Sequence, residues 1–326
     1  MDVSKYDGTI HPDEWIEQIR KYYYGYKHLN NYYNFEEFTR TMIDSTISIP
    51  DFADISELIN LLKQHITFTA FKNSRKRKLQ SLKFIPERQG GDTTSFLVKF
   101  RSFCRDAEIN DIEEIKTYFY KTLPKGFIQD KFLEQMNNGI NSMNELTQLF
   151  ENIMLEDSIL IRNGSRVAIK HVATGKYLSA SYKCYQNTNR KIVYAGSVPN
   201  SDAQWIVKFS GLNELALNES TLLILDHEIY QYLFFKPFST TKSPASKNME
   251  VTCGTSGTEW KFKSKNNRKY LKSHDIIFLE SSIKHLNLRS HDFTFTVDDV
   301  VYQEVVAHEE RIGGNDEWYI ELLSYN

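Results

Sequence analysis

The spacing of apolar residues changes once along this 326-residue chain. Before about Leu160, apolar residues recur with the period of 3.6 that is typical of amphipathic helices. Beyond it they alternate with polar residues, as in half-buried strands, and Asn163-Gly164 is a turn signal at the change. We therefore expect an all-helical domain over residues 1–158 and an all-β domain over 159–326. Each would have ~160 residues, which is enough for a core of its own.

Start signals divide the first half into helices. Pro12, followed by two acidic residues, opens a stripe formed by Trp15, Ile16, Ile19 and Tyr23. Later stripes each begin after a residue that suits an N-cap, namely Asp54, Asp92, Asp111 and Ser142. These stripes predict a bundle of packed helices.

The second half contains an internal repeat. A shift of 55 residues carries Tyr177-Leu178 onto Tyr232-Leu233 and Trp205 onto Trp260. In both copies the Trp follows the Leu by 27 positions. Repeats of this size predict an architecture in which neighbouring units complete one core.

The same shift lays Val167–His171 over Leu222–Asp226, and a looser third copy follows. In that copy Leu286 takes the place of the Leu anchor, and Trp318 closes it 32 positions later. Three β-rich units that each end on a Trp predict a closed three-fold structure, because one unit alone cannot bury its apolar face. We expect the three Trp rings to be buried at equivalent positions.

The run Gly164–Leu178 contains the pattern V-x-I-x-H-x-x-T-G-x-Y-L. It resembles the opening signature of the MIR domain, a β-trefoil named for protein mannosyltransferases and for inositol-trisphosphate and ryanodine receptors. The resemblance covers about residues 162–326 and implies a trefoil, with His171, Thr174 and Gly175 as the residues of the motif's turn. The second copy has Asp226 in place of His171, and the third lacks both the His and the Gly.

Part of the helical half resembles the capsid segment of retrotransposon Gag polyproteins, over about residues 65–135. The pattern lies in Thr94–Phe103 and Tyr118–Pro124, with Thr122 where that family usually has Gly. The resemblance implies a capsid-like helical fold that self-associates. No zinc knuckle accompanies it, and an unrelated helical adaptor domain remains an open alternative.

Charge and cysteine content limit the binding partners and the cellular compartment that we expect. The 40 basic and 42 acidic residues nearly cancel, so the chain as a whole does not attract nucleic acid or anionic membrane surfaces. No run reaches the ~20 apolar residues that cross a bilayer. Three cysteines suggest reduced thiols and a cytoplasmic protein. One basic cluster is compatible with nuclear import or phosphate contacts but has no aromatic residue for base stacking; it consists of Arg75, Lys76, Arg77 and Lys78.

Residue sets for chemistry are missing from the sequence. No His pair or Cys pair has the spacing of zinc ligands, and no nucleophile elbow or phosphate loop occurs. His171 has no base or nucleophile beside it, so we expect it to hydrogen-bond a strand or turn within the barrel. We expect neither an enzyme nor a bound metal or cofactor.

The sequence thus predicts a binding protein in which the trefoil loops recognise a protein or glycan. The loops considered are Thr174–Lys176, Tyr182–Arg190 and Lys236–Asn248, and the candidate ligand residues are Lys176, Tyr182, Tyr185 and Asn187. The helical domain would mediate assembly or docking, including association into a homo-oligomer. The alternatives are a carbohydrate-binding lectin, a Gag-derived protein that binds nucleic acid, and an accessory module of a mannosyltransferase system.

Overall fold

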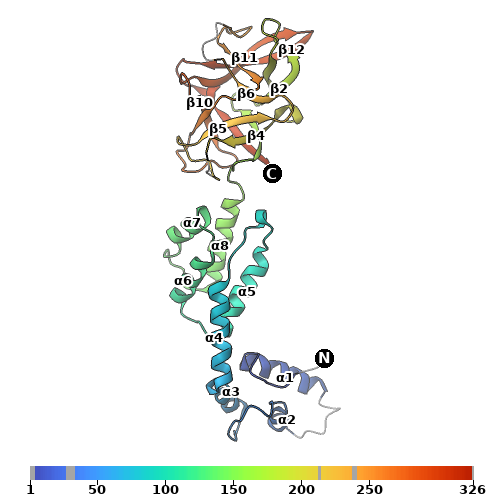
Figure 1. The fold of residues 1–326 in the computed structure, drawn as a ribbon, viewed down its shortest axis with the longest axis vertical. Coiled ribbons are helices and arrows are strands. Elements are labelled where there is room, and N and C mark those ends of the chain that lie inside the picture. The colour runs from blue at the N-terminus through green and yellow to red at the C-terminus, as the bar shows by residue number, and fades with distance from the viewer. Residues whose placement is uncertain (1–3, 27–33, 212–213, 237–240, 325–326) are drawn as a thin grey trace. The chain divides into compact units, whose positions relative to one another are not determined.

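The computed structural model describes residues 4–26, 34–211, 214–236 and 241–324. The chain divides into a helical unit, Met1–Leu155, and a β unit, Glu156–Asn326 (Figure 1). The boundary was predicted after residue 158 and lies after residue 155, because the last two residues of the final helix, Glu156 and Asp157, belong to the β unit. The two-part organisation of helices followed by strands agrees with the sequence prediction.

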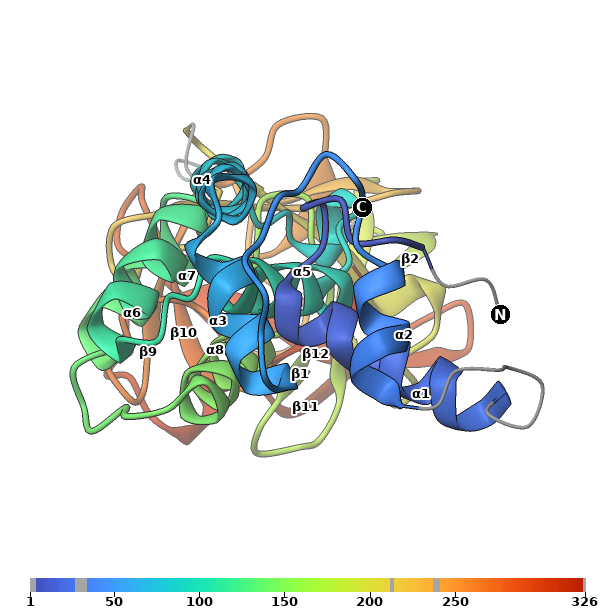
Figure 2. The ribbon, with the colours of Figure 1, turned by 90° about the horizontal axis from the view of Figure 1, so that it is seen from below.

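The helical unit consists of short and medium helices. They are α1 (Pro12–Tyr26), α2 (Phe35–Thr41), α3 (Ile55–Gln64), α4 (Ile66–Ser81, seen end-on in Figure 2), η2 (Glu87–Gln89), α5 (Thr93–Asp106), α6 (Ile112–Thr122), α7 (Phe127–Gln135) and α8 (Met143–Asp157). The four predicted N-caps are present. Asp54, Asp92, Asp111 and Ser142 each accept a hydrogen bond from the backbone N–H three residues later, at 2.8 to 3.2 Å.

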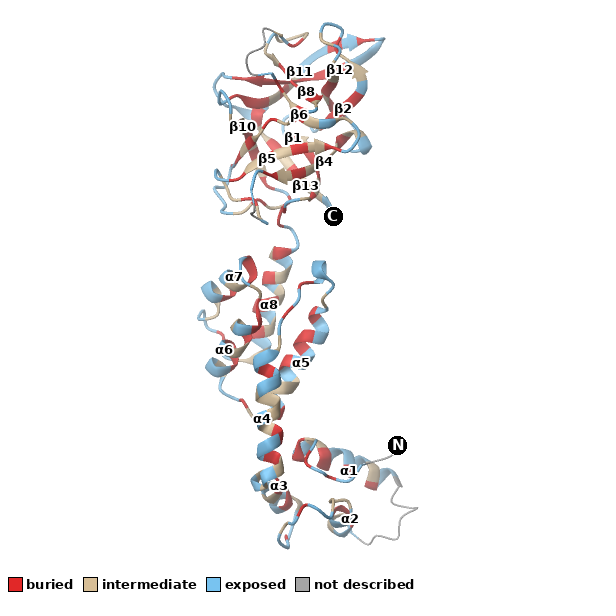
Figure 3. Cartoon of the chain, in the orientation of Figure 1, coloured by how far each residue is buried: buried red, intermediate tan, exposed pale blue. Residues whose placement is uncertain are grey.

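Two groups of apolar side chains fill the helical unit, and Figure 3 shows the buried positions along one face of several helices. One group lies among α1, α2 and α3 around Trp15 and Ile19. In the other, aromatic rings from the later helices meet at centroid distances of 4.9 to 6.3 Å; these rings belong to Phe96, Phe100, Phe119, Phe132 and Phe150. Much of the aromatic content of the helical unit is therefore core. Tyr24 is exposed, whereas Tyr32 and Tyr33 lie outside the described residues.

The β unit contains antiparallel strands in three sequential groups. The first is β1 (Arg166–His171), β2 (Tyr177–Cys184), β3 (Lys191–Gly196), η3 (Ser201–Ala203) and β4 (Gln204–Phe209). The second is β5 (Leu222–His227), β6 (Gln231–Phe234), β7 (Met249–Glu250), β8 (Thr252–Gly254) and β9 (Trp260–Ser264). The third is β10 (Ile276–Ser281), β11 (Asn287–Val297), β12 (Val300–His308), η4 (Gly314–Asp316) and β13 (Trp318–Ser324).

The pairing of these strands closes a barrel. Going round it, β1 pairs with β4, β4 with β5, β5 with β9, β9 with β10, β10 with β13, and β13 with β1. Of the remaining strands, six form the hairpins β2–β3, β6–β8 and β11–β12, and the short strand β7 pairs with β12. A closed barrel with one hairpin from each repeat is the architecture of a β-trefoil, and we call residues 156–326 the trefoil unit.

The three Trp anchors occupy equivalent places, as predicted. Trp205, Trp260 and Trp318 are each fully buried. They stand opposite Val167, Leu223 and Ile277 on the first strand of a repeat, respectively. The barrel core therefore contains the same pair three times.

The register of the repeats differs from the prediction. Since Val167 matches Leu223, four residues further on His171 matches His227 and not Asp226. The first strands are thus offset by 56 residues and the second strands by 55, because the turn between them is one residue shorter in the second repeat. An alignment without a gap misses this change.

The third anchor also shifts. The indole N–H of Trp318 donates to the carbonyl of Leu288 at 2.9 Å, just as Trp205 donates to Leu178 at 2.8 Å. Leu288, and not Leu286, is therefore the equivalent of Leu178. Leu286 is buried as well, in the position of Lys176.

Candidate ligand-binding site

Two buried histidines fasten the turns that precede the Trp strands. His171 Nε2 lies 3.0 Å from the carbonyl oxygen of Asn315, and its ring lies 5.0 Å from Trp318. His227 Nε2 lies 3.2 Å from the carbonyl oxygen of Asp202, and the centroid of the His227 ring lies 5.1 Å from that of the Trp205 ring. The predicted hydrogen bonding of His171 within the barrel is thus present, and the second repeat has it too.

The second nitrogen of each ring contacts a different kind of turn. His171 Nδ1 lies 2.8 Å from the Thr174 hydroxyl. His227 Nδ1 accepts from the backbone N–H groups of Ile229 (3.3 Å) and Tyr230 (3.4 Å). The Tyr230 ring then stacks on the imidazole of His227, 4.8 Å between centroids. The place of Thr174 in the first repeat is thus taken in the second by Tyr230, whose ring packs on His227 and against the barrel core.

Tyr230 belongs to a group that we call the tyrosine site: Tyr182 of β2, Tyr194 of β3, Tyr230 of the β5–β6 turn, and Asp202 of η3. Burial raises the pKa of Tyr230, and the neighbouring Asp202, Cys253 and Tyr182 raise it further. Burial also raises the pKa of Tyr194 to about 12, with added effects of Asp202, Tyr302 and Tyr230. The charge of Asp202 thus acts on two phenols that come from different repeats.

The site rests on a fixed support. The Tyr194 ring packs edge-on against buried Tyr302 at 5.0 Å, and the Tyr302 hydroxyl lies 3.4 Å from Ser181 Oγ. A Cβ added to Gly196 would lie 3.1 Å from the Tyr194 ring, so the ring lies close over this glycine. Tyr182, 68% exposed, is the outermost member of the group.

The carboxylate of Asp202 is available to a ligand. Its backbone N–H interacts with Asn200 Oδ1 and its carbonyl with His227, but no hydrogen bond or ion pair to the side chain occurs among the described residues. Chemically, the tyrosine site offers exposed and half-buried rings beside an acceptor. Such rings pack against the C–H faces of a small polar ligand, while the acceptor takes its hydroxyl hydrogens.

The four predicted ligand residues lie in different surroundings. Tyr182 is part of the tyrosine site. Lys176 is half-buried in the β1–β2 turn and Asn187 is exposed in the β2–β3 turn, and no contact among the described residues joins either of them to the site.

The expectation that Tyr185 is exposed was wrong. Its hydroxyl donates to the carbonyls of Val193 and Val251 at 3.1 Å, and its ring packs 5.5 Å from Phe295. Tyr185 follows the end of β2 at Cys184 and packs into an apolar cluster with Ile192 and Phe295. Tyr185 is core and cannot present its ring to a ligand.

The predicted long loop Lys236–Asn248 is also more ordered than expected in its described part, from 241 onward. The backbone N–H groups of Ala245 and Ser246 donate to the buried carboxylate of Glu304 at 2.8 and 3.0 Å. Burial works against the charge of Glu304, but nearby His291, 3.4 Å away, and the hydrogen bonds from Ser246 and Ala245 lower its pKa to about 2. These hydrogen bonds hold the described part of the loop against β12.

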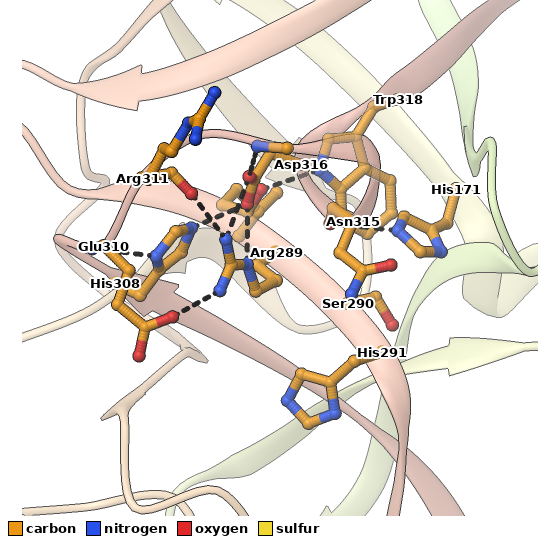
Figure 4. A network of polar contacts seen from close by, with 12 residues as sticks. His171, Arg289, Ser290, His291, His308, Glu310, Arg311, Asn315, Asp316 and Trp318 are labelled. Atoms are coloured by element: carbon orange, nitrogen blue, oxygen red, sulfur yellow. Dashed lines mark hydrogen bonds and ion pairs between the residues drawn. The ribbon is translucent and has the colours of Figure 1, made fainter.

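A second buried acid organises the third repeat (Figure 4). Asp316 accepts from Arg289 Nε (2.8 Å), His308 Nε2 (2.6 Å) and the N–H of Gly313 (2.6 Å). Despite its burial, hydrogen bonds from His308 and Arg289 lower the Asp316 pKa to about 2. Every partner belongs to β11, β12 or the η4 turn, so this cluster holds the turn that precedes Trp318.

The basic cluster lies within α4 and is partly neutralised. Arg75 pairs with buried Asp106 at 3.2 Å and lies 4.6 Å from the Phe71 ring. Lys76 is half-buried, whereas Arg77 and Lys78 are exposed. Only part of the cluster therefore faces solvent.

Two further features concern the described part of the chain. No helix there is both long and apolar enough to cross a membrane. No group of three or more His, Cys, Asp or Glu side chains in those residues is arranged to hold a metal.

No family model matches this chain, and no curated protein matches it in sequence. Among solved structures, the SDF2-like protein from Arabidopsis thaliana is similar at 24% identity and a TM-score of 0.46, covering 52% of this chain and 99% of that one. The S. cerevisiae protein O-mannosyltransferase Pmt1-Pmt2 complex bound to the sugar donor is similar at 15% identity and a TM-score of 0.42, and the match covers 70% of this chain and 36% of that one. The Macrolepiota procera ricin B-like lectin in complex with lactose is similar at 14% identity and a TM-score of 0.34, and the match covers 49% of this chain and 97% of that one. These likenesses are too weak to carry a functional argument, and the trefoil assignment rests on the strand pairing.

Proposed function

We propose that this protein binds a carbohydrate at the tyrosine site and that it does so without catalysis. The observation that carries the proposal is the carboxylate of Asp202, which has no partner among the described residues and lies on a turn that His227 connects to the stacked ring of Tyr230. Tyr182 adds an exposed ring. Rigid tyrosine rings supply contact area at little entropic cost. The MIR-like motif of the first repeat is consistent with this role but does not by itself identify a ligand.

A small polar ligand fits these residues better than a protein surface does. A stable protein interface usually buries more than about 1,000 Å² around a cluster of apolar anchors. In the tyrosine site only Tyr182 is strongly exposed, and the other two rings are half-buried. Protein recognition is therefore the alternative outcome of the test.

The test is a glycan array probed with the full chain and with two variants. Tyr182→Ala should lower binding by about tenfold or more, since it removes the outer ring, while the melting temperature stays unchanged because the side chain is exposed. Phe293→Ala is the matched control: Phe293 is 58% exposed on β11, outside the site, and its loss should leave binding intact. A wild-type chain that retains no glycan, or a Tyr182→Ala variant that binds equally well, would refute the proposal.

For the helical unit we propose a role in assembly or docking. The support is the Gag-like pattern together with exposed apolar side chains on several helices, among them Tyr24, Val98 and Leu133. This role is separate from carbohydrate binding, and either part of the proposal can fail alone.

A further inference from the structure

We propose that His227 is the positioning residue of the tyrosine site and that the site keeps its ligand only while this imidazole is neutral. The inference rests on the proposed function, because it concerns the same site. It starts from the fact that one buried ring holds two of the site's members from opposite sides, Asp202 through its carbonyl and Tyr230 through its N–H.

The hydrogen-bond partners fix the protonation state of the ring. Two backbone N–H groups, from Ile229 and Tyr230, point at Nδ1, so this nitrogen must be an acceptor without a proton. The single proton is on Nε2, which donates to the carbonyl oxygen of Asp202. The ring therefore needs its neutral form to satisfy both turns.

A second proton has no place in this arrangement. Added at Nδ1, it would face two N–H donors, and like donors repel. Either the turn of residues 228–230 opens and takes the stacked Tyr230 with it, or the ring turns and releases Asp202. Both movements separate the phenol from the carboxylate that the ligand contacts.

The charges around His227 do not remove this constraint. Burial lowers its pKa, although the carboxylates of Asp202, Asp226 and Glu228 act in the opposite direction. Asp226 is itself paired with Lys208 at 2.6 Å, and Glu228 with Arg166 at 2.9 Å. The ring stacks with Tyr230 and meets Trp205 edge-on, and neither of these side chains carries a charge at neutral pH.

His171 supplies the internal comparison. It fastens the η4 turn in the same way, but its Nδ1 meets the hydroxyl of Thr174. A hydroxyl can rotate from donor to acceptor, so a proton on Nδ1 of His171 still finds a partner. The two histidines thus hold equivalent turns and are equally buried. Only His227 lacks an acceptor for a second proton, because its Nδ1 faces two N–H donors.

The experiment is a pH titration of the full chain, from about pH 7.5 down to about pH 5, which covers a lowered imidazole pKa and stays above the range near 4 in which carboxylates ordinarily titrate. The first readout is the set of backbone amide NMR signals of Ile229 and Tyr230. The second is binding to immobilised glycans on the array. Burial lowers the pKa of His227, so the changes should begin only below the ordinary imidazole range near pH 6.5. As His227 then acquires its second proton, the two amide signals should shift and binding should fall by about tenfold.

Two substitutions test the role of the ring. His227→Asn keeps an acceptor for the turn N–H groups, and His227→Gln keeps a donor toward Asp202, but neither titrates. Both should weaken binding and abolish its pH dependence in this window. His171→Gln should lower stability to a similar degree and leave the pH dependence unchanged.

The outcomes separate the two proposals. Unshifted Ile229 and Tyr230 signals, or a His227→Asn variant that retains the wild-type pH profile, would overturn the role of His227. If no glycan binds at either pH while the amide signals shift as expected, carbohydrate binding fails and the positioning role stands. If His227→Asn does not fold, the wild-type titration and His227→Gln still decide the question.

Discussion

At the scale of single residues, the three Trp anchors are not chemically equal. Trp205 and Trp318 donate their indole N–H to Leu178 and Leu288. In the second repeat the corresponding carbonyl, of Leu233, accepts from the backbone N–H of Thr258 at 3.0 Å. The Nε1 of Trp260 is buried and has no partner among the described residues. The second repeat therefore lacks one internal hydrogen bond that its counterparts have.

Substituting each Trp by Phe measures that difference. All three variants lose similar packing, but Trp205→Phe and Trp318→Phe also lose a hydrogen bond, so they should be less stable than Trp260→Phe by about 1 kcal/mol. Urea unfolding of the three full-length variants provides the measurement. An equal or larger loss for Trp260→Phe would contradict the assignment of its unpaired N–H.

Asp316 makes the stability of the trefoil sensitive to strong acid. Its pKa is lowered from 3.8 to about 2 in the folded protein, so the unfolded chain binds the proton first as the pH falls. The resulting stabilisation, about 2 kcal/mol, is fully present above about pH 4 and is lost as the pH falls toward 2.

Asp316→Asn should therefore flatten the dependence of unfolding free energy on pH between about 4 and 2. At neutral pH it should also cost about 3 kcal/mol, because Arg289 and His308 lose a buried charged partner. Asp299→Asn, at an exposed hairpin tip, is the control and should change neither quantity. A variant with the wild-type acid profile would show that Asp316 does not contribute this term.

At the scale of the elements, the hairpins differ in how tightly they close. Gly196 in β3 and Gly254 in β8 hold equivalent positions, opposite Tyr177 and Tyr232. A Cβ on Gly196 would come within 2.8 Å of Ser179 Oγ and 3.1 Å of the Tyr194 ring, whereas one on Gly254 would touch Phe234 at an ordinary 3.5 Å. The β2–β3 hairpin thus depends on its glycine and the β6–β8 hairpin does not.

Gly196→Ala should consequently displace Tyr194 and reduce glycan binding, while Gly254→Ala should bind like the wild type. Affinity for the best array glycan and thermal stability of both variants are the measurements. Equal affinity of the two variants would indicate that the position of Tyr194 is irrelevant to the ligand.

Local signals explain what could be predicted at this scale. A cap such as Asp54 acts on a neighbour three residues away, and alternation within one strand reveals the buried face, so helix starts and barrel strands follow from short windows. The register of the second repeat did not follow, because one residue is missing from a turn. Tyr185 was misassigned because its burial comes from contacts with residues distant in the sequence, such as Val251 and Phe295, which the polar turn around it does not reveal.

The tyrosine site was largely beyond sequence reasoning for a different reason. Tyr182 and Tyr194 come from one repeat and Tyr230 from the next, and the pairing of β4 with β5 joins the two repeats in the barrel. The spacing of these residues in the sequence does not predict that they belong to one site. Only the exposed Tyr182 was identified beforehand, from its place beside a polar turn.

At the scale of the whole molecule, the helical unit should make the protein associate with itself if its Gag-like pattern reflects function. The full chain should then sediment as a dimer or larger species at high micromolar concentration. Val98→Glu, at an exposed position of α5, should weaken that association, because it puts a charge on an apolar contact surface. A wild-type chain that stays monomeric would exclude assembly through this unit.

The central claim is that ligand recognition takes place at the tyrosine site, and its most direct test locates the ligand. Tyrosine residues labelled with ¹³C in the aromatic ring can be followed by NMR while the full chain is titrated with the best-binding glycan of the array. The account predicts that the signals of Tyr182, Tyr194 and Tyr230 shift together and that buried Tyr185 stays unchanged. Shifts confined to tyrosines of the helical unit, or saturable binding without any change at these three, would contradict it.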